Sequence, residues 1–374
     1  MSLKVGIVGL PNVGKTTLFN AMTGLDAPVS SFPYTTIQPN IGAVSVPDER
    51  LDKLVKIYNP KKVVHASIEF VDIAGIGVGA SKGEGLGNEF LVNVRESDAL
   101  VEVVRCFDNP EVPMEGEIDP LGDIESLGLE LIFADLDVIE KRLPRLETKA
   151  KSKNDKDSMI EYNILLKCHE QLSNMKPIRD LHLSKEDAKY IKNYSFLTEK
   201  PILYVLNISE SDLGKEDSEQ IKAVKAKALA EGSVAITLSA EVEYEISKLD
   251  GDDKEMFLED YGLERPGLDM MVNSAYKLLG LETIFTCGEK DCHAWTYKKG
   301  SKAPQVAGVI HTDFERGFIR MEVIAYKDLI EAGSEQKAKE LNKQRVEGKE
   351  YIVQDGDIVN VRFNVWQEKK LLKN

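Results

Sequence analysis

The sequence predicts an α/β fold with a parallel sheet, an inserted pair of helices and a small C-terminal α+β region. Three features support this prediction. The chain opens on an apolar run, a glycine-rich turn and a helical pattern; residues 124–194 have a long helical periodicity; and short β-rich runs begin after residue 280. Such an opening, followed by alternating strands and helices, is typical of parallel α/β domains. Because 374 residues exceed one ordinary core, two or three domains are expected.

The composition is typical of a soluble globular protein, with 42% hydrophobic and 30% charged residues. No apolar run reaches the roughly 18 residues needed to cross a bilayer. The first apolar run leads directly into a glycine-rich turn and lacks a signal-peptide cleavage pattern. Four cysteines do not make a disulfide framework in so long a chain, which favours a reducing compartment. We therefore expect a cytoplasmic protein without membrane contact.

Cys287, Cys292 and His293 lie close together in the sequence, so a metal site is one interpretation. The spacing is not that of a C-x-x-C pair, and no second ligand pair follows. Buried or idle thiols are therefore the preferred interpretation.

The net charge of −15 argues against a surface that binds nucleic acid over its whole extent. Residues 141–160 are a local exception, with seven Lys or Arg against three Asp or Glu. This basic segment is either a solvated helical face or a contact for RNA or another acidic partner.

The α/β region contains six apolar, β-rich runs that predict strands. They cover residues 4–9, 43–46, 66–72, 99–105, 201–206 and 233–238. One helix is predicted at residues 15–23, where Gly24 ends it, and another at residues 88–96. Between the predicted strands at residues 99–105 and 201–206, apolar residues recur at helical spacing from Leu127 to Leu143 and again from Ile160 to Leu172. This pattern predicts two antiparallel helices inserted into the α/β region.

The C-terminal region has β-rich runs around Phe285, at residues 306–310 and 319–324, and at residues 358–363 after a polar turn. They predict a small separate α+β domain. It also carries aromatic side chains among glycines and charges: Trp295, Tyr297, His311 and Phe314. An aromatic platform for RNA is conceivable, but core packing is the commoner explanation.

The segment Gly9-Leu10-Pro11-Asn12-Val13-Gly14-Lys15-Thr16 follows the first strand and opens the first helix, as a P-loop must. The glycines let backbone N–H groups turn inward around a phosphate, and the helix N-terminus adds partial positive charge. Lys15 would bridge the outer phosphates, and the Thr16 hydroxyl would ligate Mg²⁺. The residues expected to bind phosphates are Asn12, Val13, Gly14, Lys15, Thr16 and Thr17.

A carboxylate on the metal side is expected at Asp72, which ends a hydrophobic strand and begins the D-x-x-G pattern that closes at Gly75. The Gly75 amide would read the γ-phosphate, so Lys15 and Gly75 are the catalytic candidates. Thr36 is the expected switch threonine, with Thr35 as the alternative and an ordinary turn as the simpler interpretation. The predicted Mg²⁺ ligands are thus Thr16, Thr36 and Asp72. The glycine-rich segment 75–87, which includes Lys82 and Glu84, suits a switch that orders on the γ-phosphate.

The base-reading motif is Asn207-Ile208-Ser209-Glu210, where GTP-specific proteins place N-K-x-D. Glu210 is one methylene longer than the Asp that accepts two hydrogen bonds from guanine, and Ile208 replaces the Lys. The fit to guanine is therefore poor, and the Asn207 amide can instead meet the N6/N7 edge of adenine. The next strand ends in a loop that fits the base side of the same fold. The expected base-side residues are Asn207, Ile208, Glu210, Ser239 and Ala240, and Phe32 is also expected to bind the nucleotide.

Five segments together resemble the YchF/Obg-like ATPase family, P-loop proteins of the translation-factor class. They are GLPNVGKTT, FPYTTIQPN, DIAGIGVGASKGEGLGNEFL, NISE and APQVAGVIHTDFERGFI. The resemblance runs from Lys4 to about Val365. It implies a G domain at residues 1–125 and 200–282, an inserted helical hairpin at 126–199, and a C-terminal TGS domain, a β-grasp module, at 283–366. It also implies a preference for ATP over GTP and a ribosome, or ribosome-associated RNA or protein, as partner.

Two positions depart from the expected water-positioning groups. The residue after D-x-x-G is a Gln in small GTPases, but here it is Ile76, which cannot hydrogen-bond. Many members of the YchF/Obg-like ATPase family have a His in the loop after strand 99–105, and in this chain that position falls on Pro113. We therefore expect slow hydrolysis, with water placed by backbone, by Glu111 or Glu115, or by a partner. For both glutamates, a plain solvated loop charge is the simpler interpretation.

The resulting interpretation is a monomeric ATPase that binds Mg²⁺ and acts as a regulatory switch on the ribosome. Two alternatives stay open. One is a conventional GTP-specific GTPase with a degenerate base motif, and the other is a nucleotide-sensing adaptor in which hydrolysis is incidental.

Overall fold

The computed structural model describes residues 3–25, 39–75, 86–113, 116–153 and 155–364. The chain divides into two compact units. The first contains residues Met1–Val44 and Glu69–Leu279, and the second contains Ser45–Ile68 and Gly280–Asn374. None of the helices in the described ranges combines the length and the apolar character needed to cross a bilayer.

The first unit is built on a six-stranded sheet in the order β2-β4-β1-β5-β6-β7. Its strands are β1 Lys4–Val8, β2 Asn40–Ser45, β4 Ser67–Asp72, β5 Ala99–Arg105, β6 Ile202–Asn207 and β7 Val234–Leu238. β1 pairs in parallel with β4 and β5, and β6 pairs in parallel with β5 and β7. The predicted parallel sheet is therefore confirmed, and the carboxyl ends of β1, β4, β6 and β7 meet at one edge.

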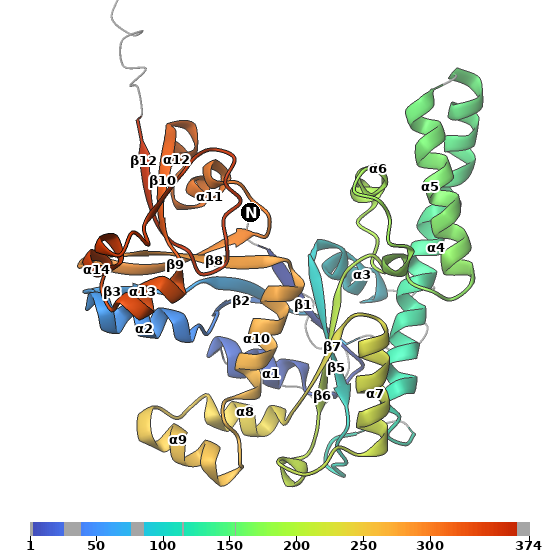
Figure 1. Ribbon diagram of the computed structural model, residues 1–374. Helices are drawn as coiled ribbons and strands as arrows, with labels where there is room; N and C mark the ends of the chain where they lie inside the picture. The colour runs from blue at the N-terminus through green and yellow to red at the C-terminus, as the bar shows by residue number, and fades with distance from the viewer. Residues whose placement is uncertain (1–2, 26–38, 76–85, 114–115, 154, 365–374) are drawn as a thin grey trace, which may run out of the picture. The chain divides into compact units, whose positions relative to one another are not determined.

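Helices cover both faces of this sheet (Figure 1). The α-helices of the first unit are α1 Lys15–Thr23, α3 Leu86–Glu96, α4 Pro120–Lys153, α5 Lys156–Ser173, α6 Asp187–Ile191, α7 Glu219–Ala230, α8 Ala240–Ile246, α9 Gly251–Asp260 and α10 Gly267–Leu278. One core lies where α3, α4 and α7 pack on the strands, with Phe90, Leu127 and Val224 buried against Leu100 and Tyr204. On the other face, α1 contacts α8 and α10 contacts β6 and β7.

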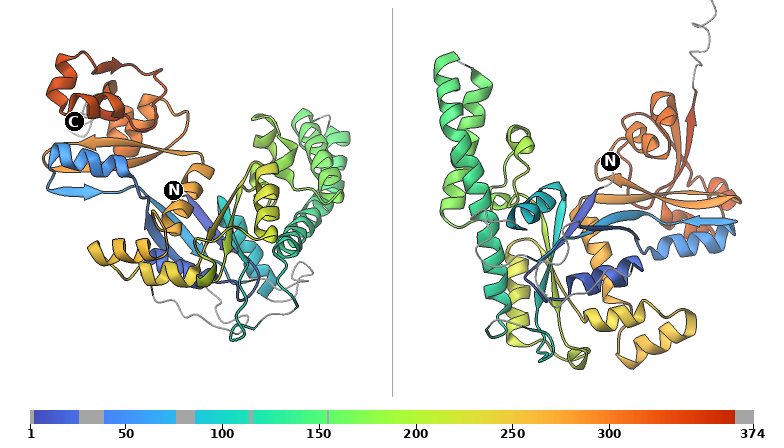
Figure 2. Two further views of the ribbon diagram at one scale, coloured as in Figure 1. Left: turned by 60° about the horizontal axis from the view of Figure 1, so that its bottom comes forward. Right: turned by 180° about the vertical axis from the view of Figure 1, so that it is seen from behind.

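The long helix α4 packs against α5 beyond the sheet, where the green helices run side by side in Figure 2. The periodic apolar residues of both helices make a second core. Its members include Ile139, Leu146, Ile164, Leu165, Cys168 and Leu172. The apolar periodicity of residues 124–172 therefore predicted the right faces of both helices.

The basic segment 141–160 forms the end of α4 and the start of α5, and several of its cations have partners within the chain. Lys141 pairs with Asp137 at 2.6 Å, and Arg142 pairs with Glu161 at 3.3 Å. Lys149 lies 3.3 Å from Asp155. Exposed pairs of this kind are typical of a solvated helical face. They are weak enough to be exchanged for a partner's charges, so the RNA contact stays an open alternative.

The second unit has its own six-stranded sheet, in the order β11-β10-β12-β8-β9-β3. Its strands are β3 Lys62–Val64, β8 Leu281–Cys287, β9 Asp291–Lys298, β10 Phe318–Ile324, β11 Arg345–Glu347 and β12 Ile358–Phe363. Its helices are α2 Glu49–Tyr58, α11 Ala303–Ile310, α12 Thr312–Arg316, α13 Tyr326–Ala332 and α14 Glu335–Glu340. The predicted mixture of strands and helices is confirmed.

The second unit differs from the expected boundaries in one respect: residues 45–68 were expected in the first domain. β3 instead pairs in parallel with β9, with Val63 opposite Cys292. The Arg50 guanidinium of α2 donates to Asp355 at 2.8 Å. Strand pairing across more than two hundred residues leaves no mark in the local pattern, so the sequence could not reveal it.

The run at residues 306–310 was predicted as a strand, and this prediction is wrong: it belongs to helix α11. Pro304 lies in the first turn, where its missing N–H costs nothing. The Gln305 side chain accepts a hydrogen bond from the Lys302 N–H at 2.9 Å. This N-terminal cap outweighs the β-propensity of the two valines and the isoleucine that follow.

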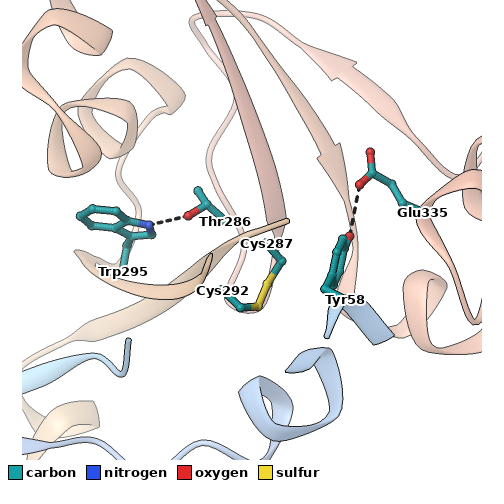
Figure 3. The surroundings of a disulfide bond; sticks show 6 residues. All are labelled: Tyr58, Thr286, Cys287, Cys292, Trp295 and Glu335. Carbon is teal, nitrogen blue, oxygen red and sulfur yellow. Dashed lines mark hydrogen bonds between the residues drawn. A yellow bond between two sulfur atoms is a disulfide. The ribbon is translucent and has the colours of Figure 1, made fainter. Parts of the chain in front are cut away.

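The prediction of idle thiols is also wrong for two of the four cysteines. Cys287 and Cys292 lie opposite each other in the β8–β9 hairpin and form a disulfide (Figure 3). Their Cα atoms are 4.1 Å apart, a distance set by the antiparallel register rather than by the sequence spacing. In the described residues, no group of three or more potential His, Cys, Asp or Glu ligands is placed to hold a metal ion.

The aromatic residues near the hairpin belong to the core of the second unit. Tyr297 is buried, and Trp295 and Phe314 pack against the same core. The Trp295 indole N–H also donates to Thr286 at 2.9 Å (Figure 3). Core packing, rather than an RNA platform, explains these side chains.

Candidate nucleotide site

The phosphate loop has the backbone that its glycines predict. Gly9 has φ 145°, and a Cβ there would lie 2.4 Å from the Val103 carbonyl oxygen. Gly14 has φ 100°, and a Cβ there would lie 2.4 Å from the Asn207 side-chain nitrogen. Any side chain at either position would collide with the neighbouring strand end, so both glycines are needed for the loop to lie against the sheet. Asn12 also has a left-handed backbone, with φ 61°.

Lys15 lies buried inside this loop. Its Nζ donates to the carbonyl oxygens of Leu10 at 2.7 Å and Gly9 at 3.2 Å. Burial lowers the pKa of Lys15 to about 8, and the nearby Asp72 charge opposes the shift. A Cβ on Gly75 would lie 2.8 Å from Nζ, so the ammonium group and the D-x-x-G glycine are neighbours. The two catalytic candidates, Lys15 and Gly75, are therefore brought together.

The metal-side pair is also assembled. The Thr16 hydroxyl donates to Asp72 Oδ2 at 3.0 Å. Burial raises the pKa of Asp72, while hydrogen bonds from Thr16 and Asn40 and the charge of Lys15 act in the opposite direction. Mg²⁺ prefers hard oxygen ligands and needs only one or two protein groups besides phosphates and water. This hydroxyl–carboxylate pair beside the phosphate loop fits that requirement. Thr36 and its alternative Thr35 lie outside the described residues.

The Asn207 side chain has a structural role that the sequence did not indicate. Its Nδ2 donates to the Val13 carbonyl oxygen at 2.8 Å, and its Oδ1 accepts from the Ala240 N–H at 2.8 Å. Each end of the buried amide therefore bonds one backbone group, and Asn207 joins the phosphate loop to the base-side loop. The amide keeps a second N–H and a second lone pair, so its contact with the N6/N7 edge of adenine stays a prediction.

The rest of the base side is fixed by packing. Ile208 is buried in the main core, so its side chain turns away from the loop surface. Ser239 and Ala240 are buried at the start of α8. Glu243, in the same helix, accepts hydrogen bonds from the N–H groups of Gly267 and Leu268 and so caps α10. Burial raises the pKa of Glu243 to about 6, against the effect of these two bonds.

The loop after β5 lies beside the phosphate loop. The Asn12 side-chain amide donates to the Pro113 carbonyl oxygen at 3.2 Å. Arg105 organises this loop from within, because its guanidinium donates to carbonyl oxygens of Phe107, Asn109 and Val112 at 3.1 to 3.4 Å. Pro113 thus contacts the phosphate loop through its carbonyl oxygen, and its place beside the attacking water stays a prediction.

Several predicted residues lie outside the described part of the chain. They are Phe32, Thr35, Thr36, Ile76, Lys82, Glu84 and Glu115. Glu111 is described and exposed, and its N–H donates to the Asn109 side chain at 2.9 Å.

Sequence reasoning missed three residues that organise the site. Arg105 ends a predicted strand, and a cation directly after an apolar run was the signal that could have found it. Glu243 lies four residues after Ser239, one helical turn along, which places it on the base-side helix. Tyr261, whose hydroxyl donates to Glu210, lies 51 positions further along and had no local signal.

The chain matches known proteins over nearly its whole length. Residues 4–134 match the family model described as a 50S ribosome-binding GTPase. Residues 281–364 match the C-terminal model of YchF GTPases, described as a protein of unknown function. A relative from Bacillus subtilis (strain 168), named ribosome-binding ATPase YchF, is 50% identical over 367 residues, which cover 98% of this chain and 100% of the relative.

Two further relatives agree. The protein of the same name from Escherichia coli O157:H7 is 48% identical over 366 residues, which cover 98% of this chain and 100% of that protein. The solved structure of the Schizosaccharomyces pombe YchF GTPase matches with a TM-score of 0.85 at 36% sequence identity, over 96% of this chain and 98% of that chain.

Proposed function

The chain belongs to the YchF family, and from that premise we propose that it is a Mg²⁺-dependent P-loop ATPase that acts as a slow regulatory switch on the ribosome. The convergence of Lys15, Thr16, Asp72 and Gly75 carries the catalytic part of this proposal. Lys15 would hold the outer phosphates, and the Gly75 amide would read the γ-phosphate. Thr16 and Asp72 would hold Mg²⁺, which neutralises charge on the phosphate oxygens when bound.

Adenine is the proposed base for two reasons. The relatives from Bacillus subtilis and Escherichia coli are named ATPases. In this chain, Ile208 turns into the core where guanine-specific proteins have a Lys, and Glu210 is one methylene longer than the guanine-reading Asp. A site with incomplete hydrogen bonds to guanine rejects it strongly, because buried donors are then left unpaired.

Slow hydrolysis is proposed because the loop at Pro113 offers backbone rather than a side chain to the attacking water. Arg105 fixes that loop through three carbonyl oxygens. Its replacement by Lys keeps the charge but loses the planar fork of donors. We expect Arg105→Lys to lower the single-turnover rate while ATP affinity changes little. Unchanged rates in Glu111→Ala and Glu115→Ala would remove the carboxylate route.

A switch needs a path from the γ-phosphate to another part of the chain, and α3 offers one. This helix begins at Leu86, eleven positions after Gly75 of the D-x-x-G segment. Its Arg95 lies 3.6 Å from the buried carboxylate of Asp135 in α4. Lys200 donates to the Arg95 carbonyl oxygen at 3.0 Å. We propose that ordering of α3 by ATP is transmitted through these contacts to the α4–α5 pair.

The remaining assignments belong to the same proposal. The α4–α5 pair acts as an inserted hairpin domain, and the second unit acts as a TGS-type docking module of β-grasp type. We further propose that the protein works in the cytoplasm as a monomer. The ribosome is its proposed partner, as the names of its relatives suggest.

Competition binding tests the nucleotide assignment. With Mg²⁺ present, ATP should displace a fluorescent nucleotide analogue at lower concentration than GTP. A clear preference for GTP would overturn the ATPase assignment and favour the GTPase named in the N-terminal family model. Multiple-turnover hydrolysis with and without ribosomes tests the switch. A rate that ribosomes do not raise, with ATP-independent ribosome binding, would contradict it.

A further inference from the structure

The carboxylate of the base-reading motif has a partner from a distant part of the chain. Glu210 begins a short 3-10 turn, Glu210–Asp212, directly after β6. Its Oε1 accepts a hydrogen bond from the Tyr261 hydroxyl. Tyr261 is the C-cap residue that follows α9. The group that would read guanine in a GTPase is therefore already bonded to the protein itself.

The Tyr261 ring is held by packing, so its hydroxyl has a defined place. The ring lies against Phe257, with centroids 5.0 Å apart. Both rings pack on a small core formed by Val242, Ile246 and Leu258 of α8 and α9. Because α8 starts at the Ser239-Ala240 loop, the same two helices support the base-side loop and place the Tyr261 hydroxyl.

The chemistry of the two bases makes this bond consequential. Guanine offers two donors on its Watson–Crick edge, N1–H and the exocyclic amine, and a carboxylate reads it by accepting from both. Adenine offers an acceptor at N1, which a carboxylate in the same place would repel. A carboxylate drawn to a tyrosine hydroxyl is less available to guanine and less repulsive to adenine.

We propose that Tyr261 is a specificity-determining positioning residue, whose hydroxyl holds the Glu210 carboxylate out of the guanine-reading position. This inference rests on the proposed preference for ATP and gives it a structural cause. It also explains why a motif that keeps an acidic residue can still disfavour guanine. The added methylene of Glu210 gives the carboxylate the reach to meet α9.

The test is the ATP-to-GTP affinity ratio of Tyr261→Phe, which keeps the ring and its packing but removes the hydroxyl. Dissociation constants would be measured for Mg²⁺ complexes of both nucleotides with the full chain. We expect GTP to bind more tightly and the ATP-to-GTP affinity ratio to fall about tenfold. This change corresponds to about 1.4 kcal/mol of binding free energy. If Tyr261 had only a structural role, Tyr261→Phe would weaken the binding of ATP and GTP equally and leave their affinity ratio unchanged.

Two further variants complete the design. Tyr244→Phe removes a hydroxyl from α8, where the ring lies 4.0 Å from the Lys248 ammonium, and should leave the ratio at the wild-type value. Adding Glu210→Ala to Tyr261→Phe should abolish the gain in GTP affinity. A ratio unchanged in Tyr261→Phe, or a gain that survives Glu210→Ala, would overturn the inference while the wild-type preference for ATP stands. A wild-type preference for GTP would instead overturn the proposed function itself.

Discussion

The phosphate side and the base side of the nucleotide site are built in different ways. On the phosphate side, consecutive residues from Gly9 to Thr16 form the loop, and among the described residues Asp72 and Gly75 join it from the end of β4. On the base side, each position depends on contacts between residues far apart in the sequence, such as Asn207 with Ala240 and Glu210 with Tyr261. The phosphate side therefore sets the class of chemistry, and the base side sets which nucleotide is used.

The largest expected effect is on the phosphate side. Lys15→Ala should lower the rate of hydrolysis by about 10² to 10³, because a buried ammonium group beside the phosphates is lost. It should weaken ATP and GTP to the same extent, since both carry the same phosphates. Single-turnover kinetics with both nucleotides measures this. Lys222→Ala on α7, which removes an exposed lysine, is the matched control. If Lys15→Ala weakened binding or hydrolysis of one nucleotide alone, the phosphate side would also contribute to the choice of nucleotide.

Asn207→Ala should have the next largest effect. It leaves the Val13 carbonyl oxygen and the Ala240 N–H without their partner, and a buried unmade hydrogen bond costs about 1–3 kcal/mol. We expect binding of ATP and of GTP to weaken by about tenfold to a hundredfold, together with a lower melting temperature. Asn273→Ala, which removes an amide bonded within α10, is the control. Weakening of ATP alone would show that Asn207 acts through a contact with adenine rather than through the bridge between the two loops.

The pH dependence of nucleotide affinity should be smaller. In the free protein the pKa of Lys15 is about 8, and bound phosphates should raise it. Above pH 8 the free lysine is neutral and must take up a proton on binding, so affinity falls as pH rises, by up to about tenfold per pH unit. Calorimetry between pH 7 and pH 10, in buffers of different ionisation enthalpy, measures the affinity and the proton uptake together. Different slopes for ATP and GTP would show that the base side contributes.

The smallest expected effect concerns the support of the base-side loop. The folded-state pKa of Glu243 is about 6, above its ordinary value of 4.5. The folded protein therefore holds a proton that the unfolded chain releases, and this stabilisation is lost as pH rises through 6. Relative to Glu243→Gln, the wild type should lose about 1 kcal/mol of unfolding free energy between pH 4.5 and pH 7. Denaturant unfolding at several pH values measures this free energy. If it depended on pH in the same way in the wild type and in Glu243→Gln, the prediction would be wrong.

The predictions from sequence were most accurate where the relevant residues are neighbours in the chain. The strand at residues 99–105 and the helix at 15–23 have the bounds that their apolar patterns indicated. The contact between Thr16 and Asp72 followed from the rule that parallel strands end at the same edge of a sheet. The strand predicted at residues 306–310 failed because an N-terminal cap can override the β-propensity of a short run.

The sequence alone was enough to predict the phosphate loop around Lys15 and the hydroxyl–carboxylate pair of Thr16 and Asp72, and it has no hydrogen-bonding side chain at Ile76 or Pro113. The contacts between distant residues came from the fold: Asn207 bridges two loops, Tyr261 holds Glu210, residues 45–68 belong to the second unit, and Cys287 meets Cys292. The physical reason is the same in each case. A motif fixes the geometry of residues that share one turn of backbone, whereas contacts between separate elements depend on register and packing, which the whole fold sets.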